Sequence, residues 1–423
     1  MYTVPGMLFA DYLKEEIKLA LGCTEPASIA FAAASASSMT RGKVKSARLV
    51  CDPRIYKNCY AVGIPHSGHK VGIKWALAIG CLLPDPALKL ECFKQIDENI
   101  LKEAGELIDS GGIQVEVDPG AQDLLVDCEI ERNDTVRAVI EHDHTRLVRL
   151  LKNGAPVDIE VEKASTTHTS IREILAGLPF GNLIDLARSI TNADRRELQK
   201  GSDLNMAIAN HGLSLFPKRF VDMAGADPLT RISRLVCTGV YARMWGEDFV
   251  VTAVAGSGNK GIVCSVPLTL FGKEIQADPR LIDESLALAC LVTSSTTHHL
   301  GTLSAVCGCS NAAGIGLSAG LVLLQGGGPD EISMAINNMV GNVTGMICDG
   351  AKIGCALKTM TSVDAAFRSA SLALSGIGIP YSDGIVGEDG MASLRNLGQI
   401  ATEGMAKTDE EILKIMQKKL SSS

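Results

Sequence analysis

Four cysteines in the last third of the chain lie in two glycine-flanked groups. Cys307 and Cys309 fall in VCGCS, and Cys348 and Cys355 fall in ICDGAKIGC. Thiolates are the protein ligands that soft metals and iron–sulfur clusters prefer, and glycines let the backbone approach a bulky inorganic group. No CxxC pair of the kind found in structural zinc sites occurs in the sequence. The pattern predicts an iron–sulfur site, and the alternative is a set of buried structural cysteines.

A further cysteine lies where a helix is expected to begin. In GCTEP, Pro26 suits the first turn of a helix, which places Cys23 just before its N-terminus. The positive end of the helix dipole favours a thiolate, so we predict a lowered pKa for Cys23 and a role as base or nucleophile. Glu25 opposes thiolate formation unless its side chain points away. The alternative is a loop cysteine that only packs.

The segment VAGSGNKG, residues 254–261, has the composition of an anion-binding loop. Its N–H groups can surround an anion, and Lys260 can pair with a carboxylate, with Ser257 and Asn259 beside it. The spacing is not that of a P-loop, and no βαβ unit with an acidic partner surrounds it, as a dinucleotide site would require. An ordinary turn is the alternative.

Asparagine and histidine side chains offer further polar contacts. Asn58 lies near the end of a predicted strand and is a candidate for binding substrate. A glycine–proline turn is the alternative interpretation of this segment. Neither histidine pair has the i,i+4 spacing of a helical metal site. We predict that His142 and His144 are surface residues, and that His298 and His299, which precede Cys307, line the same pocket as the cysteines.

Two kinds of element must position these residues. Residues 8–38 are predicted to be helical, with a break at 22–26, because their apolar residues form a stripe between Lys and Glu. From about 45 to 165, short alternating segments predict strands with one solvated face, and helices are expected at 75–83 and 96–109. The predicted strands are 48–51, 60–63, 114–117, 124–130, 135–141, 147–151 and 157–161.

After residue 170 the strand signals almost vanish. Glycine-rich loops separate helical segments, and residues 407–423 predict a charged helix with a serine-rich end. The fold class predicted is therefore α+β, with an N-terminal helix and a mixed α/β subdomain followed by a mainly α-helical catalytic domain. The predicted boundaries are 1–44, which carries Cys23, 45–168 for the α+β subdomain, and 169–423 for the helical iron–sulfur domain.

The composition excludes several classes of protein. The chain has 423 residues, of which 46% are hydrophobic and 21% charged, so a sizeable core is expected. A formal charge of −8, without a basic run, argues against nucleic acid or an anionic membrane as partner. The first residues lack the pattern of a secretory signal, and no stretch is apolar enough to span a membrane. We expect a cytoplasmic protein whose 13 cysteines are free thiols or ligands.

Several motifs together resemble the L-cysteine desulfidase family, long catalogued as uncharacterised. They are GCTEPASIAFA, KNCYAVGIP, VAGSGNKGI, VCGCSNAAGIG and MICDGAKIGCALK, and the resemblance covers nearly the whole chain. That family is similar in its C-terminal half to the iron–sulfur L-serine dehydratase alpha chains. The resemblance implies a [4Fe–4S] cluster held by three cysteines with one iron open. Cys348 and Cys355 match two ligands, and the third is Cys307 or Cys309, with Cys309 favoured because GCS looks like the serine dehydratase segment.

The resemblance also implies an activity. Cys23 matches the family's proposed proton-abstracting cysteine, and the chain lacks the terminal cysteine of the serine dehydratases, which favours the desulfidase branch. The expected reaction is elimination of sulfide from L-cysteine to give pyruvate and ammonia. Alternatives are L-serine dehydratase, a non-catalytic iron–sulfur redox sensor, and a pyridoxal phosphate enzyme. The sequence leaves the oligomeric state open, with a homodimer as one option. The residues expected to bind the amino acid are Glu25, Asn58, Ser257, Asn259 and Lys260.

Overall fold

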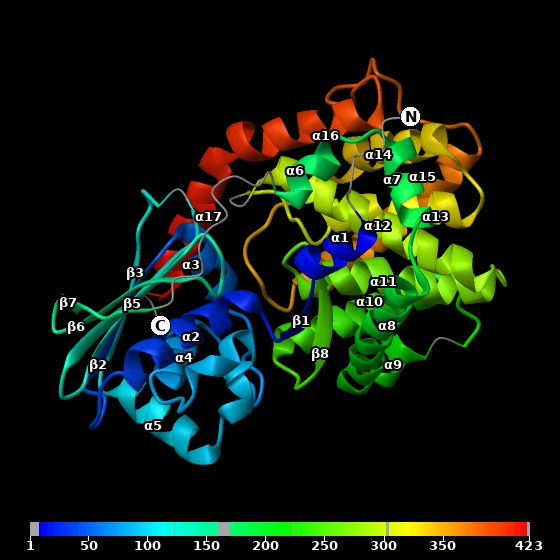
Figure 1. The fold of residues 1–423 in the computed structure, drawn as a ribbon. Coiled ribbons are helices and arrows are strands. Elements are labelled where there is room, and N and C mark those ends of the chain that lie inside the picture. Colours follow the sequence, from blue (N-terminus) through cyan, green and yellow to red (C-terminus); the bar gives the residue numbers. More distant parts are fainter. Residues whose placement is uncertain (1–7, 122, 160–169, 223, 302–303, 421–423) are drawn as a thin grey trace.

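The chain folds into two lobes that lie side by side (Figure 1). The computed structural model describes residues 8–121, 123–159, 170–222, 224–301 and 304–420. Each lobe has its own hydrophobic core. We call residues 24–159 together with the C-terminal helix the α+β lobe, and residues 8–21 together with 170–404 the helical lobe. A largely helical chain with one six-stranded sheet confirms the predicted α+β class.

The α+β lobe is a mixed sheet covered by helices on one face. The strand order is β3-β2-β4-β5-β6-β7, with β2 and β3 parallel and the other neighbours antiparallel. Along β4, Val126, Cys128 and Ile130 are buried and alternate with acidic residues, so one face is apolar. Helices α2, α4 and η1 pack together on this lobe, with α2 against β4 and β5. The elements are α2 (Thr24–Ser38), β2 (Ser46–Cys51), α3 (Pro53–Cys59), α4 (Ile73–Gly80), η1 (Pro86–Gln95), α5 (Glu98–Asp109), β3 (Ile113–Val117), β4 (Leu125–Glu131), β5 (Thr135–Glu141), β6 (Leu147–Lys152), β7 (Ala155–Pro156) and α17 (Ala406–Leu420).

The helical lobe is built around the closely packed pair α12 and α13. Glycines on α13 permit this approach, since a Cβ at Gly316 would lie 2.4 Å from the carbonyl oxygen of Ala289 on α12. Small residues therefore allow these two helices to lie close together. The elements are α1 (Phe9–Glu16), β1 (Ile17–Leu21), α6 (Ile171–Ala176), α7 (Phe180–Arg188), α8 (Asn192–Gly212), η2 (Leu213–Leu215), α9 (Lys218–Val221), α10 (Pro228–Trp245), β8 (Val250–Val254), α11 (Gly258–Glu274), α12 (Pro279–Leu300), α13 (Asn311–Leu324), α14 (Pro329–Val343), α15 (Cys355–Leu374), α16 (Gly390–Gln399) and η3 (Ile400–Gly404).

The prediction of helix throughout 8–38 is wrong at residues 17–21. These residues form β1, which pairs antiparallel with β8, a strand that the sequence analysis missed in the helical half. The segment is short, and its lysine and leucine residues suit a helix locally. A partner more than 200 residues away decides its conformation, because pairing with β8 satisfies the backbone of both strands.

Two other predicted strands are not formed as such. Residues 60–63 contain a bend and one isolated bridge between Gly63 and Val71. Gly63 packs against the helical lobe instead, since a Cβ there would lie 2.3 Å from the carbonyl oxygen of Trp245. Residues 157–159 are irregular, and the remainder of the predicted strand 157–161 lies outside the described residues. The charged C-terminal helix predicted from residue 407 is confirmed as α17.

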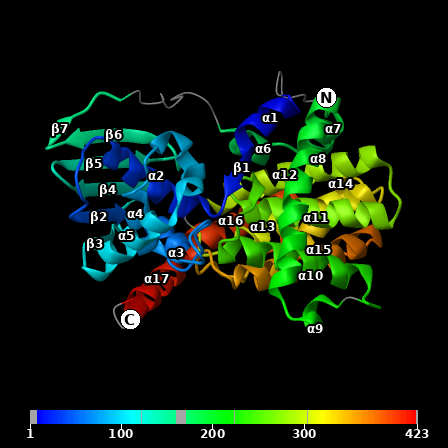
Figure 2. The same cartoon turned by 90° about the horizontal axis from the view of Figure 1, so that it is seen from below.

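The ends of the chain link the lobes. The N-terminal segment is divided, because Phe9 and Tyr12 lie in the core of the helical lobe whereas α2 belongs to the other core. Helix α17 leaves the helical lobe and runs toward the α+β lobe in both views (Figures 1 and 2). Its Ile412 and Met416 pack into the core of the α+β lobe. Hydrophobic packing thus crosses the boundaries expected from the sequence. Among the helices described, none is long and apolar enough to cross a bilayer.

Candidate active site

A cavity of about 580 Å³ lies where the two lobes meet. Its walls come from the start of α2 and from α3 on one side, and from α10, α11, α12 and the cysteine loops on the other. All the site residues expected from the sequence line it. They are Cys23, Glu25, Asn58, Ser257, Asn259, Lys260, Cys307, Cys309, Cys348 and Cys355.

The two cysteine loops lie next to each other because their backbones are hydrogen-bonded. The N–H of Cys307 donates to the carbonyl oxygen of Met346 at 2.8 Å, and the N–H of Cys348 donates to that of Ala305 at 2.6 Å. These two bonds form an isolated bridge between Val306 and Ile347. Segments about 40 residues apart in sequence are thereby held in one register, and their thiols face the same cavity.

The four thiols are close enough to influence one another. Cys348 is hydrogen-bonded to Cys307, and Cys307 to Cys309; the bond from Cys307 lowers the pKa of Cys309. Burial raises the pKa of Cys355 to about 12, and the nearby Cys307 adds to this effect. Among the described residues, no three His, Cys, Asp or Glu side chains converge on the position of a single metal ion. A [4Fe–4S] cubane does not require its ligands to converge on one metal position, because each of its cysteines binds a separate iron.

A glycine and a buried lysine hold the Cys348 loop against the α+β lobe. Gly350 has a φ of +92°, and a Cβ there would lie 2.0 Å from the carbonyl oxygen of Lys57. The Lys57 side chain is buried and forms an ion pair with Asp409 of α17. The interaction with Cys307 and burial raise the pKa of Cys348 well above its usual value, and the charge of Lys57 only partly opposes this. Only glycine satisfies both the left-handed conformation and the close contact. The loop, α3 and α17 therefore form one packed unit behind the cysteines.

Replacing Gly350 by alanine is expected to lower the free energy of unfolding by at least about 2 kcal/mol, because strain and overpacking add. Thermal or denaturant unfolding measures this loss. Gly345→Ala is the matched control in the same segment, since its Cβ would meet no atom within 4 Å. Equal stabilities of the two variants would contradict the packing described here.

Cys23 lies at the N-cap of α2, as predicted, but its expected pKa shift has the wrong sign. Its thiol donates a 3.0 Å hydrogen bond to Oε2 of Glu25. Burial, followed by the charge of Glu25, raises the pKa of Cys23 well above its usual value, and Arg243 only partly opposes this. The Glu25 side chain points toward the sulfur of Cys23. Its negative charge therefore opposes the thiolate, as predicted for this orientation. In this structure Cys23 is a thiol that is hydrogen-bonded to an acceptor.

Glu25 is the centre of a polar cluster on the α+β lobe. Oε2 also accepts a bond from Thr24 at 2.9 Å, and Oε1 accepts one from the Asn58 amide at 2.9 Å. Burial alone would favour the neutral acid, but the nearby His144, the bond from Cys23 and the charge of Arg54 outweigh it and lower the pKa of Glu25 to about 2. Glu25 is therefore an ionised acceptor within a largely buried site.

Arg243 connects Cys23 with the glycine-rich loop. Its two terminal nitrogens donate to the carbonyl oxygen of Gly22 at 2.6 Å and to Oδ1 of Asn259 at 2.9 Å. Asn259 is 2% exposed, and its amide nitrogen contacts the sulfur of Met244. The amide of Asn259 is thus already engaged within the protein, and its clearest effect is to orient Arg243 beside Cys23.

Lys260 and Ser257 face the cysteine loops from the start of α11. Lys260 donates to the carbonyl oxygen of Ala255 at 3.1 Å and to Thr297 at 2.9 Å, and burial, with a contribution from Arg172, lowers its pKa to about 8. Ser257 lies 3.5 Å from the sulfur of Cys309. A cation and a hydroxyl therefore lie next to the thiols.

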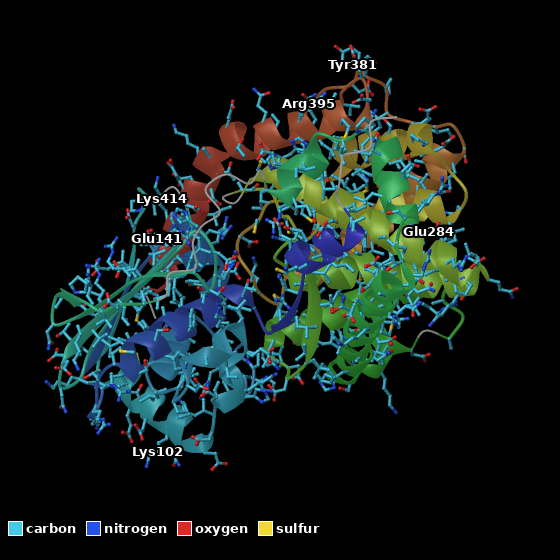
Figure 3. The ribbon with its side chains drawn as sticks, viewed as in Figure 1. Lys102, Glu141, Glu284, Tyr381, Arg395 and Lys414 are labelled. Atoms are coloured by element: carbon cyan, nitrogen blue, oxygen red, sulfur yellow. The ribbon has the colours of Figure 1, made fainter. Side chains whose placement is uncertain are left out.

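Sequence analysis missed several charged residues of this cavity. Arg54, Lys57, Arg172 and Arg243 all line it. Only Lys57 belongs to one of the quoted motifs, KNCYAVGIP, where it was not singled out. Charged side chains elsewhere, such as Lys102 and Lys414, project from the outside of the lobes (Figure 3). The cavity is therefore lined by a mixture of cations and carboxylates, which suits a small zwitterion.

The histidine predictions are partly wrong. His298 lines the cavity, as expected, whereas His299 is not part of its lining. His142 is exposed and paired with Asp123, as expected for a surface residue at the mouth of the cavity. His144 is not a surface residue, because the turn between β5 and β6 folds back so that its ring lies 3.9 Å from Glu25.

Comparison with known proteins agrees with this architecture. Residues 96–414 match the serine dehydratase alpha chain family. The UPF0597 protein GSU1527 of Geobacter sulfurreducens is 35% identical and covers 98% of this chain and 99% of its own. The UPF0597 proteins of Desulfatibacillum aliphaticivorans and Clostridium tetani are each 33% identical over 97% of this chain and 98% of theirs.

The match spans three quarters of the chain and includes the loops of Cys307 and Cys348. The chain belongs to the serine dehydratase alpha chain family, and within it to the group of UPF0597 proteins. The family points to a serine dehydratase-like lyase, whereas the names of the UPF0597 relatives carry no activity.

Proposed function

We propose that this protein is an L-cysteine desulfidase, a carbon–sulfur lyase of the cytoplasm that converts L-cysteine to pyruvate, ammonia and hydrogen sulfide. One observation carries the proposal. A candidate proton acceptor, Cys23, shares one cavity with four adjacent thiols and with charged groups of both signs. The resemblance of GCTEP and ICDGAKIGC to the desulfidase family supports sulfide rather than water as leaving group.

The cysteine loops fit a [4Fe–4S] cluster by the chemistry of their donors. Cys309, Cys348 and Cys355 would hold it, with Cys307 as the alternative to Cys309, and Gly308 and Gly350 keep these loops free of bulky side chains. The charge of Lys57 acts on the pKa of Cys348, and Cys348 acts on the pKa of Lys358. Both lysines would therefore offset the negative charge of the thiolates. When bound, a cluster with an open iron supplies a Lewis acid.

The protein's own residues move the protons. Cys23 loses its thiol proton to solvent and, as thiolate, takes the proton from Cα of the substrate, while Glu25 keeps its charge as the hydrogen-bond acceptor beside the sulfur. Arg243 favours this thiolate, because its charge lowers the pKa of Cys23. The Cβ–S bond breaks with its electron pair on sulfur, which leaves as HS⁻. The resulting aminoacrylate tautomerises and adds water to give pyruvate and ammonia.

Anaerobic turnover of L-cysteine and of L-serine tests the proposal. We expect sulfide and pyruvate in equal amounts from L-cysteine, with a much lower kcat/KM for L-serine. Iron-free protein is the control for spontaneous sulfide release. A higher kcat/KM for L-serine would contradict the desulfidase assignment.

The family match favours one second candidate, L-serine dehydratase, in which water leaves instead of sulfide. The same assay distinguishes the two by the substrate preferred. Turnover of neither amino acid by iron-loaded protein would favour a non-catalytic iron–sulfur redox sensor over both lyases.

A further inference from the structure

His144 presents a buried ring nitrogen that has no hydrogen-bond partner among the residues described. The His144 ring is part of the cavity wall, and this nitrogen, Nε2, lies 3.9 Å from Oε1 of Glu25. That separation is too long for a hydrogen bond between the two groups. A buried polar atom without a partner is costly, so the gap calls for a ligand.

The gap has a fixed width because both groups belong to the α+β lobe. Glu25 lies in the first turn of α2, and His144 lies in the turn between β5 and β6. Ser28, one helical turn after Thr24, donates a 2.8 Å hydrogen bond to the carbonyl oxygen of His144. The turn is thereby attached directly to α2, so the two side chains keep their spacing.

Both groups are hydrogen-bond acceptors. Glu25 is ionised, and its Oε1 accepts a hydrogen bond from Asn58. Burial lowers the pKa of His144, although Glu25 acts in the opposite direction, so the imidazole is neutral. With its proton on Nδ1, the ring offers a lone pair at Nε2. Two acceptors and one negative charge therefore face the same gap.

A donor with several hydrogens and a positive charge complements this gap. An ammonium group can bond to two acceptors spaced in this way and neutralises Glu25. Arg54 lines the same wall and is close enough to shift the pKa of both residues. A molecule with an ammonium group at the gap can therefore place a carboxylate toward a cation of the cavity wall.

We propose that His144 and Glu25 together bind the α-ammonium group of the substrate, and that His144 selects amino acids over acids that lack the amine. This assignment rests on the proposed function, because it takes the cavity to be the amino acid site. His144 acts as a specificity residue and exchanges no proton with the substrate.

Two ligand pairs separate selectivity from chemistry. L-Cysteine and 3-mercaptopropionate differ only in the amine, and L-alanine and propionate form a pair without leaving group. KM for L-cysteine and the inhibition constant for 3-mercaptopropionate are measured with the iron-loaded enzyme. Binding of L-alanine and propionate is measured by calorimetry.

The expected result is a selective loss. His144→Leu raises KM for L-cysteine and weakens L-alanine binding by about 10- to 100-fold, the effect of one hydrogen bond to a charged group. Inhibition by 3-mercaptopropionate and binding of propionate change by less than about threefold, within the scatter of a near-neutral substitution. His144→Gln, which keeps an acceptor, recovers part of the loss. Thr145→Ala, in the same turn but outside the lining of the cavity, leaves both ratios unchanged.

A parallel loss for both members of each pair would overturn the assignment and show that His144 only maintains the shape of the cavity. A fall in kcat at constant KM would overturn it as well. Selective L-alanine binding without L-cysteine turnover would refute the desulfidase function while supporting the role of His144. Turnover of L-cysteine by an enzyme in which His144→Leu affects both members of each pair equally would support the desulfidase function and refute the role of His144.

Discussion

Replacing Cys348 or Cys355 by serine is expected to abolish the iron–sulfur absorbance of the anaerobically purified protein and to reduce its iron to background. A serine oxygen is a poor ligand for the iron of such a cluster, and both thiols line the cavity on a loop that is fixed by the Cys307–Met346 hydrogen bond. The visible spectrum and iron analysis of the purified variants measure the effect. Cys309→Ser is expected to match these two, whereas Cys307→Ser retains iron.

Cys237→Ala is the matched control for the cysteine variants. Its thiol is 1% exposed and lies in α10 of the same lobe, outside the lining of the cavity. The control should keep the iron of the wild type. Full iron content in Cys348→Ser or Cys355→Ser would remove that residue from the ligand set. Loss of iron in Cys307→Ser but not in Cys309→Ser would identify Cys307 as the third ligand.

Replacing Cys23 by alanine is expected to reduce kcat about 10²- to 10⁴-fold, the usual contribution of a positioned general base, while the iron content stays unchanged. The thiol donates to Glu25 and is adjacent to Arg243, and within the described part of the chain no hydrogen bond joins it to the four cysteines of the two loops. Iron analysis and anaerobic sulfide release on one sample separate the two effects.

Cys59→Ala is the control for this second variant. Cys59 is fully buried in α3, near enough to Cys23 for their charges to interact, but outside the lining of the cavity. It should retain turnover, since only a small buried thiol is lost. Full activity in Cys23→Ala would exclude Cys23 from the mechanism. Loss of iron in that variant would show a structural role.

The identity of the site residues could be predicted from the sequence because they lie in short motifs. Each cysteine group has its own glycines, and GCTEP contains both the thiol and the helix start. Such local patterns constrain local backbone geometry, which is the part of a site that sequence determines most directly. The bridge between Val306 and Ile347 brings the two cysteine motifs together, and Arg243 connects GCTEP with the glycine-rich loop.

The charges around these motifs could not be predicted. Arg243 and Lys57 occur in ordinary helical sequences, and their roles depend on where α10 and α3 come to lie. The pKa of Cys23 is raised first by burial and then by the charge of Glu25, and the order of residues specifies neither. His144 was mistaken for a surface residue because the direction of the β5–β6 turn is set by its contact with Ser28.

The fold shows the same division between local and distant causes. The alternation of β4 and the charged pattern of α17 are local and gave correct elements. Residues 17–21 and 250–254 each depend on the other as strand partner, so neither carried a sufficient signal by itself. The position of α17 on the α+β lobe likewise depends on tertiary contacts. Its Ile412 and Met416 pack into a core formed by residues far earlier in the chain.

Iron and acid-labile sulfide, measured in the anaerobically isolated protein together with its rate of sulfide release from L-cysteine, test the central claim most directly. The account predicts about four irons and four sulfides per chain, as in one cubane, and a turnover that disappears when the iron is removed. Protein that contains no iron after anaerobic isolation and reconstitution, yet releases sulfide at the full rate, would contradict it.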